Sequence, residues 1–185
     1  MIFLALGTQL PFDRLTRAAD AWCADHPEAE LFGQIAELGP DNHRPAHFRW
    51  VEKMPPEAFT AAFEKADIIV AHAGMGVIIT ALTLGKPLVI MPRRADLREH
   101  RNDHQRATAA RFGGRAGVRT VETEAELRAA LDQLRAEAAA GAGETAAPVA
   151  APAFTDALRG FLLTGARPAR PDPAGSPPSP KKGRG

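Results

Sequence analysis

The sequence predicts an α/β fold in which a doubly wound parallel sheet carries helices on both faces. Over residues 1–135, short apolar runs alternate with amphipathic stretches, the order expected when each strand is followed by a helix that covers the sheet. Two of the apolar runs lead into glycine-containing turns that open a helix. The chain has 185 residues and 45% hydrophobic content, enough to bury the core of one domain.

The first strand and helix are predicted by an apolar run followed by a helical stripe. The strand covers residues 2–6, and the helix has Pro11 near its start and ends before Pro27. Residues 30–36 and 47–51 are expected as further strands, although neither is strongly apolar. The stripe of the helix consists of Leu15, Ala18, Ala19 and Trp22.

The middle of the chain repeats this pattern with a more apolar strand. Residues 68–71 are typical of a buried central strand. A helix that ends at Gly85 follows, and then a strand at residues 87–91. The apolar positions with helical spacing are Phe59, Ala62, Phe63 and Ala66 before the central strand, and Ile78, Ile79 and Leu82 after it.

Two capping patterns predict the last helices of the domain. Asn102 with Gln105 resembles a capping pair for a helix that runs through Phe112. Thr123 with Glu126 forms a capping box at the start of the final helix. The apolar stripe of that helix consists of Leu127, Ala130, Leu131 and Leu134.

The rest of the chain is expected to lie outside this domain. In residues 136–153, 10 of 18 residues are alanine, and interruptions by glycine and proline indicate a linker. Residues 154–163 carry an apolar stripe typical of a short helix that docks on its own domain or on a partner. Residues 164–185 contain six prolines, five basic residues and one acid, which predicts a disordered basic tail.

Charge and cysteine content exclude several classes of protein. The chain has 23 basic and 22 acidic side chains, so its net charge of +1 argues against a nucleic-acid-binding protein. Cys23 is the only cysteine, which excludes an internal disulfide and favours a reducing cytoplasm. It lies beside Trp22 without a neighbouring base, so we expect it to pack in the core. The apolar opening is too short to span a membrane, so any membrane contact is expected to be peripheral or through a partner.

The strongest candidate site is the turn formed by His72, Ala73, Gly74, Met75 and Gly76, between the central strand and a helix. Unpaired backbone N–H groups and the helix dipole favour an anion at such a position. The two glycines let the backbone approach the anion, and the histidine can donate a ring N–H to a phosphate oxygen. We therefore expect a phosphate or diphosphate here, with a purely structural tight turn as the alternative.

Two other segments are expected at the same carboxyl edge of the sheet. One is the turn Gly7, Thr8 and Gln9 after the first strand, and two such turns facing one crevice suit a nucleotide diphosphate. The other follows the strand at residues 87–91, and its arginines can balance phosphate charge while its amides can recognise sugar hydroxyls. A solvated charged loop is the alternative. The hydrogen-bonding residues of this segment are Arg93, Arg94, His100, Asn102, Asp103, His104 and Gln105.

His100 and His104 are spaced to share a metal on a helix, but no third ligand is evident, so we predict no metal site.

The motifs at residues 72–76, 84–87 and 102–105, in this order and spacing, closely resemble the C-terminal domain of family 28 glycosyltransferases. The resemblance covers residues 1–135 and implies a Rossmann-like sheet, equivalent to the donor-binding half of a GT-B glycosyltransferase. Within this family, the sequence resembles PssE-type subunits of bacterial exopolysaccharide synthesis and the catalytic subunit of the eukaryotic dolichol-linked N-acetylglucosaminyltransferase. The single-chain MurG is a more distant relative.

This resemblance implies an inverting enzyme that transfers a hexose or N-acetylhexosamine from a UDP-sugar to a lipid-linked saccharide, with no metal or other cofactor. Because only the donor half is present, a PssD-like membrane-associated subunit would supply the acceptor site and the general base. The chain would then be cytoplasmic and held at the inner face of the plasma membrane by that partner, and active only in the complex.

The resemblance also implies roles for individual residues. The turns at residues 7–9 and 72–76 would face the diphosphate, and Gln105 would contact donor-sugar hydroxyls with Asn102 and His104 beside it. His72, together with Arg93 or Arg94, would stabilise the charge that develops on the leaving diphosphate.

Two departures from the family leave the ribose contact and the sugar identity open. Thr80 stands where a glutamate commonly binds the ribose, and His104 where related enzymes carry an acid. A non-catalytic nucleotide-sugar-binding or scaffold subunit is therefore an alternative. An NADP-binding oxidoreductase is another, suggested by Gly74 and Gly76 after a strand, but Ile79 replaces the third glycine of the dinucleotide fingerprint.

Overall fold

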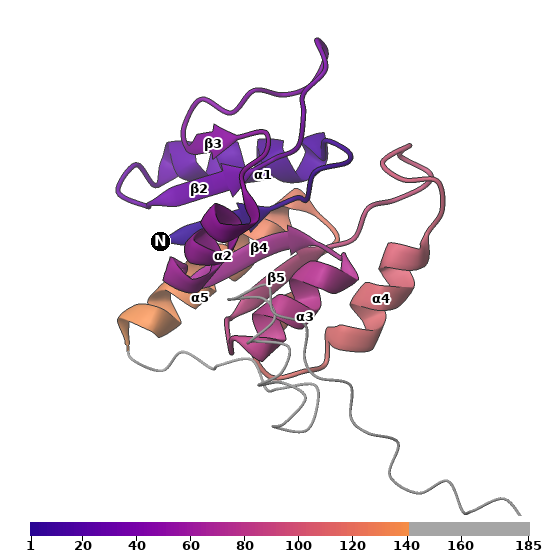
Figure 1. The fold of residues 1–185 in the computed structure, drawn as a ribbon. Helices are drawn as coiled ribbons and strands as arrows, with labels where there is room; N and C mark the ends of the chain where they lie inside the picture. The colour runs from indigo at the N-terminus through magenta and orange to yellow at the C-terminus, as the bar shows by residue number, and fades with distance from the viewer. Residues whose placement is uncertain (141–185) are drawn as a thin grey trace, which may run out of the picture.

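The computed structural model describes residues 1–140, which form a six-stranded sheet covered by five helices (Figure 1). All five strand pairs are parallel, and the order across the sheet is β3-β2-β1-β4-β5-β6. The predicted α/β fold is therefore confirmed. The strands are β1 (Ile2–Ala5), β2 (Leu31–Gln34), β3 (Arg49–Val51), β4 (Ile68–His72), β5 (Leu88–Met91) and β6 (Val118–Thr120).

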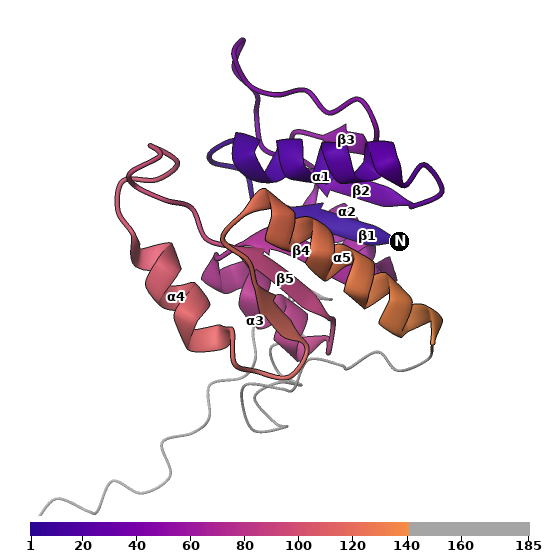
Figure 2. The ribbon, with the colours of Figure 1, turned by 180° about the vertical axis from the view of Figure 1, so that it is seen from behind.

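The helices divide between the two faces of the sheet because alternate strand residues point to opposite faces. Helices α1 (Asp13–Asp25) and α5 (Glu124–Ala139) cover one face, which Figure 2 shows in front. Helices α2 (Pro56–Lys65), α3 (Met75–Thr83) and α4 (His104–Phe112) pack on the other face, seen in Figure 1. The central strands β1, β4 and β5 are thus apolar on both sides.

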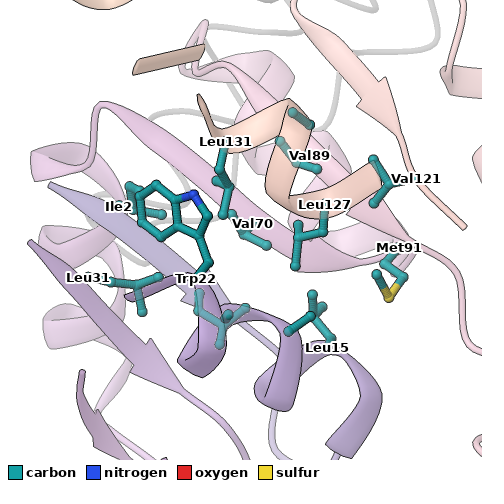
Figure 3. Close-up of a cluster of buried hydrophobic side chains, with 14 of the residues drawn as sticks. Ile2, Leu15, Trp22, Leu31, Val70, Val89, Met91, Val121, Leu127 and Leu131 are labelled. Atoms are coloured by element: carbon teal, nitrogen blue, oxygen red, sulfur yellow. The ribbon is translucent and has the colours of Figure 1, made fainter. Parts of the chain in front are cut away.

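The core under α1 and α5 is built around Trp22, whose side chain is fully buried (Figure 3). Its indole Nε1 donates a hydrogen bond of 2.7 Å to Asp132 on α5, so this large aromatic side chain keeps a polar partner. Cys23 is also buried in this core, and burial raises the pKa of its thiol to about 12, with Asp20 adding to the effect. The thiol therefore stays protonated and packs as an apolar group.

Most predicted elements are confirmed within one to three residues, but three details differ. Strand β6 was not expected, because three residues between polar turns carry little periodicity. The predicted Asn102–Gln105 capping pair is wrong: α4 begins at His104 after Asp103, without a side-chain cap. Helix α5 extends to Ala139, into the predicted linker.

The capping box of Thr123 and Glu126 is present as predicted. The rest of the predicted linker, the helix expected at residues 154–163 and the tail at 164–185 lie outside the described residues. Within residues 1–140, none of the helices is long and apolar enough to cross a membrane.

Candidate functional site

The topology brings two turns together at the centre of the sheet. The chain runs outward from β1 to β2 and β3 and then returns to pair β4 with β1, so the strand order reverses between β1 and β4. Ligands of open α/β sheets bind at the carboxyl ends of the strands at such a switch point. Gly7 follows β1 here and His72 ends β4, and a Cβ atom added to Gly7 would lie only 3.6 Å from the His72 ring.

A pocket of about 330 Å³ opens at this point, within the size range of ligand pockets. Residues from all three segments in which candidates were predicted line it: the turn after β1, the end of β4 and the segment after β5. Its lining residues are Leu6, Gly7, Thr8, Gln9, Leu10, His72, Arg93, His100 and Gln105.

His72 is held in the pocket as a neutral imidazole. Burial lowers the pKa of His72 to about 4, the positive charge of Arg93 acts in the same direction, and the Ala5 carbonyl opposes them in part. Its Nδ1 is buried and has no hydrogen-bond partner among the described residues. An unsatisfied buried polar atom costs about 1–3 kcal/mol in the free energy of folding.

The amino end of α3 lies directly against this histidine. Gly74 caps the helix without a side-chain hydrogen bond, so no side chain among the described residues caps its first-turn N–H groups. A Cβ atom on Gly74 would come within 2.4 Å of His72 Nε2, whereas one on Gly76 would meet nothing within 4 Å. Gly74 is therefore required by packing, while Gly76 borders open space from which an anion can approach the helix.

The Gly7 turn is fixed by a residue that sequence reasoning missed. Gly7 has φ +77°, a left-handed conformation that favours glycine. Gln34, at the carboxyl end of β2, donates its amide to the Gly7 carbonyl at 3.2 Å and accepts from the Met54 backbone N–H at 3.2 Å. The available signal was a glutamine within the strand expected at residues 30–36, since an amide that becomes buried needs partners.

Arg93 acts as a clamp between two loops. Its guanidinium donates hydrogen bonds of 2.6 Å to the backbone carbonyls of Leu10 and Pro11, and it stacks over the Phe12 ring at 4.6 Å. Burial lowers the pKa of Arg93 to about 10, with Glu99 opposing the shift, so the group stays charged at neutral pH. Its side chain thus shapes the pocket wall and places a positive charge beside it.

Gln105 forms a hydrogen bond with the backbone of Arg93. Its Oε1 accepts a hydrogen bond of 3.1 Å from the Arg93 backbone N–H, and its side chain is buried. Its amide nitrogen has no hydrogen-bond partner among the described residues. The amide can therefore donate to a ligand in the pocket while its oxygen fixes the loop.

A second anchor, also missed from the sequence, is the ion pair of Arg14 and Glu99. The two side chains are 15% and 12% exposed and make two hydrogen bonds of 2.7 and 2.8 Å. Glu99 also accepts from the Arg94 backbone N–H at 2.9 Å, and Arg14 donates to the Pro92 carbonyl. This bidentate pair holds the loop between β5 and α4 against α1.

The remaining predicted site residues lie around the pocket rather than in it. Arg94 pairs with Asp96, Asn102 and His104 contact each other on the surface, and Thr80 donates to the Gly76 carbonyl at 2.8 Å. Ala73 is buried and Met75 is 47% exposed. The rings of His100 and His104 are 4.6 Å apart, and the described residues contain no group of three or more potential metal ligands.

Comparison with known proteins gives one family. Residues 12–158 match the model of the glycosyltransferase family 28 C-terminal domain. The search of curated proteins found no match.

Solved structures show the fold. The solution structure of ALG13 is 17% identical, with a TM-score of 0.54 over 88% of this chain and 95% of that chain. A UDP-GlcNAc 2-epimerase from Neisseria meningitidis, bound to UDP-GlcNAc, is 15% identical, with a TM-score of 0.57 over 88% of this chain and 44% of that one. The glycotransferase of kitacinnamycin is 23% identical, with a TM-score of 0.52 over 89% and 39%. The chain thus spans less than half of the last two proteins.

Proposed function

From its membership of the glycosyltransferase family 28 C-terminal domain family, we propose that this chain is the donor-binding catalytic subunit of an inverting glycosyltransferase. The donor is a UDP-sugar, and a hexose or N-acetylhexosamine is transferred to a lipid-linked saccharide. The observation that carries this proposal is the pocket at the switch point, which is lined by the turn after β1, the neutral His72 ring and the Gln105 amide. The start of α3, which has no side-chain cap, lies against this His72 ring.

Each of these groups matches one part of a nucleotide sugar. The backbone N–H groups at the start of α3 and the neutral His72 ring bind the diphosphate, and Gln105 donates to sugar hydroxyls. As the sugar–phosphate bond breaks, negative charge grows on the diphosphate, and the helix start together with the buried charge of Arg93 stabilises it. The epimerase structure, which contains UDP-GlcNAc on a similar fold, supports the choice of a uridine nucleotide.

A partner subunit is the second part of this proposal. We infer a PssE-like role in exopolysaccharide synthesis, in which a PssD-like membrane-associated subunit supplies the acceptor site and the general base. The chain covers 95% of ALG13, a protein of similar extent, but only 39% of the kitacinnamycin glycotransferase. The isolated chain should therefore bind donor and transfer sugar slowly, because both reactants must be held in line.

Calorimetric titration of the purified chain with UDP, UDP-N-acetylglucosamine and NADPH tests the proposal. We expect saturable binding of the uridine nucleotides only, weakened at least tenfold in Gly76→Ala, which fills the open approach to α3. Binding of NADPH in place of the uridine nucleotides would favour an oxidoreductase.

Reconstitution with the partner subunit tests catalysis separately from binding. We expect sugar transfer that falls at least a hundredfold in His72→Ala. Donor binding without any transfer in the complex would instead identify a non-catalytic subunit.

A further inference from the structure

The loop between β5 and α4 carries an exposed leucine at the tip of a turn. The Arg98 backbone N–H donates to the Ala95 carbonyl at 3.0 Å, which places Leu97 at the outside of the turn with 48% of its surface exposed. Arg98 has φ +59°, a conformation that non-glycine residues rarely adopt. The turn is nevertheless held in place, because Glu99, the next residue, is anchored by Arg14.

Other large exposed apolar side chains lie on the same edge of the molecule. Leu10, on the loop after β1, is 46% exposed, and Met75, at the start of α3, is 47% exposed. With Leu97 they are the large hydrophobic side chains that the described residues expose, and all three follow the carboxyl end of a strand. Figure 1 shows the loop between β5 and α4 projecting at this edge.

Two arginines beside Leu97 have no acidic partner in the part of the chain that the structure describes. Arg98 and Arg101 are exposed and make no ion pair within residues 1–140. The neighbouring acids are already engaged: Asp96 with Arg94, Glu99 with Arg14, and Asp103 with the Ala95 backbone N–H. The loop therefore presents two uncompensated guanidinium groups.

These arginines line a second hollow of about 520 Å³ next to the donor pocket. The two hollows share Leu10 and His100. The other lining residues of the second hollow are Pro11, Asn42, Ala95, Arg98, Glu99 and Arg101.

We propose that this edge, defined by Leu10, Leu97, Arg98 and Arg101 and hereafter the arginine–leucine edge, contacts an anionic lipid bilayer directly. Guanidinium groups bind lipid phosphates, and the two leucines enter the interface between headgroups and acyl chains. The contact turns the donor pocket toward the membrane surface. It is independent of the nucleotide preference of that pocket, and it adds to any attachment through a partner.

The expected strength of membrane binding follows from the two arginine charges. Each arginine near an anionic bilayer contributes about a fivefold increase in partitioning. Two arginines give about 25-fold, which is enough to orient the protein at a membrane but only for weak, reversible binding. Raised salt should weaken it because the charges are exposed.

Co-sedimentation of the full chain with vesicles of phosphatidylcholine, alone or with one-quarter phosphatidylglycerol, tests the proposal. We expect binding to the anionic vesicles that falls at least tenfold in the double variant Arg98→Glu/Arg101→Glu. Leu97→Ser should weaken it about threefold without changing the charge. Arg111→Glu, at the far end of α4, reverses one charge away from this edge and is the control, which should bind as the wild type does.

Three results would overturn the proposal: no binding of the wild type, equal loss in Arg111→Glu, or full binding in the double variant. The last result would place lipid binding elsewhere in the chain. UDP binding, measured in the same samples, should be unchanged in all these variants. If no sample binds UDP, the proposed function is contradicted. The membrane proposal would still be decided by the vesicle measurements alone.

Discussion

At the scale of single residues, the free energy of folding is linked to pH through His72. Its pKa in the folded chain is about 4, below the usual 6.5, because burial and Arg93 disfavour the imidazolium. As the pH falls below 6.5, the unfolded chain takes up this proton before the folded chain does. The contribution of neutral His72 to the stability of the folded chain is thus present above pH 6.5 and is lost as the pH falls toward 4.

Urea unfolding at pH 7 and pH 5 tests this linkage. From the pKa shift, His72 should account for a loss of about 2 kcal/mol in the free energy of unfolding between these values. His72→Asn removes the titrating group, so its loss should be smaller by that amount. A variant with the same pH dependence as the wild type would show that folding does not lower the pKa of His72.

Two glycines in one turn give opposite expectations. Gly74→Ala would place a Cβ atom 2.4 Å from His72 Nε2, so it should lower the free energy of unfolding by about 1–3 kcal/mol. Gly76→Ala meets no atom and lies in the first turn of α3, so it should leave stability unchanged or raise it by up to about 1 kcal/mol. Urea titrations measure both. A destabilised Gly76→Ala would mean that its loss of UDP binding reports misfolding rather than a blocked site.

At the scale of the elements, α5 is the helix whose start the sequence specifies most directly. Thr123 accepts from the Glu126 backbone N–H at 3.2 Å, and Glu126 accepts from the Thr123 backbone N–H at 3.2 Å. Thr123→Ala should therefore cost about 1 kcal/mol in thermal or urea unfolding. Thr108→Ala, which removes a hydroxyl bonded within α4, is the control and should cost less. Equal losses would show that the box adds nothing beyond a helical threonine hydroxyl.

The sequence predicted the elements well where local chemistry determines them. Apolar runs and stripes determine β1, α1, β4 and α3, and a local hydrogen-bond pair determines the start of α5. It failed at Gln105, where the spacing to Asn102 suggested a cap but the amide is buried and bonds to Arg93, twelve residues earlier. Contacts of this kind depend on the path of the whole chain, which local patterns do not contain.

The same limit applied to the candidate site. The sequence placed the turns of Gly7 and His72 at one edge, because strand ends in a parallel sheet share an edge. It did not reveal the Arg14–Glu99 pair, which joins residues 85 positions apart. It also treated Arg93 as a free charge, whereas the structure engages its guanidinium with two backbone carbonyls.

At the scale of the whole molecule, the pocket draws its walls from loops far apart in the sequence. The lining residues meet only when the sheet is complete; they are residues 6–10, His72, Arg93 and Gln105. A ligand of the pocket therefore binds the folded chain and not the unfolded chain. UDP at a hundred times its dissociation constant should stabilise the fold by about 2.7 kcal/mol and raise the melting temperature by roughly 6–10 °C. Differential scanning calorimetry measures this shift. Gly76→Ala should show a much smaller one, and an equal shift would place UDP at another site.

The clamp made by Arg93 has a consequence for how this protein can be altered. Its guanidinium binds the backbone carbonyls of Leu10 and Pro11, and Gln34 binds the carbonyl of Gly7. Every amino acid has such a carbonyl, so the path of the loop does not depend on the side chains it carries. A library randomised at positions 8–10 would therefore present new ligand-contacting groups on an unchanged scaffold, a starting point for directed evolution of nucleotide and sugar preference.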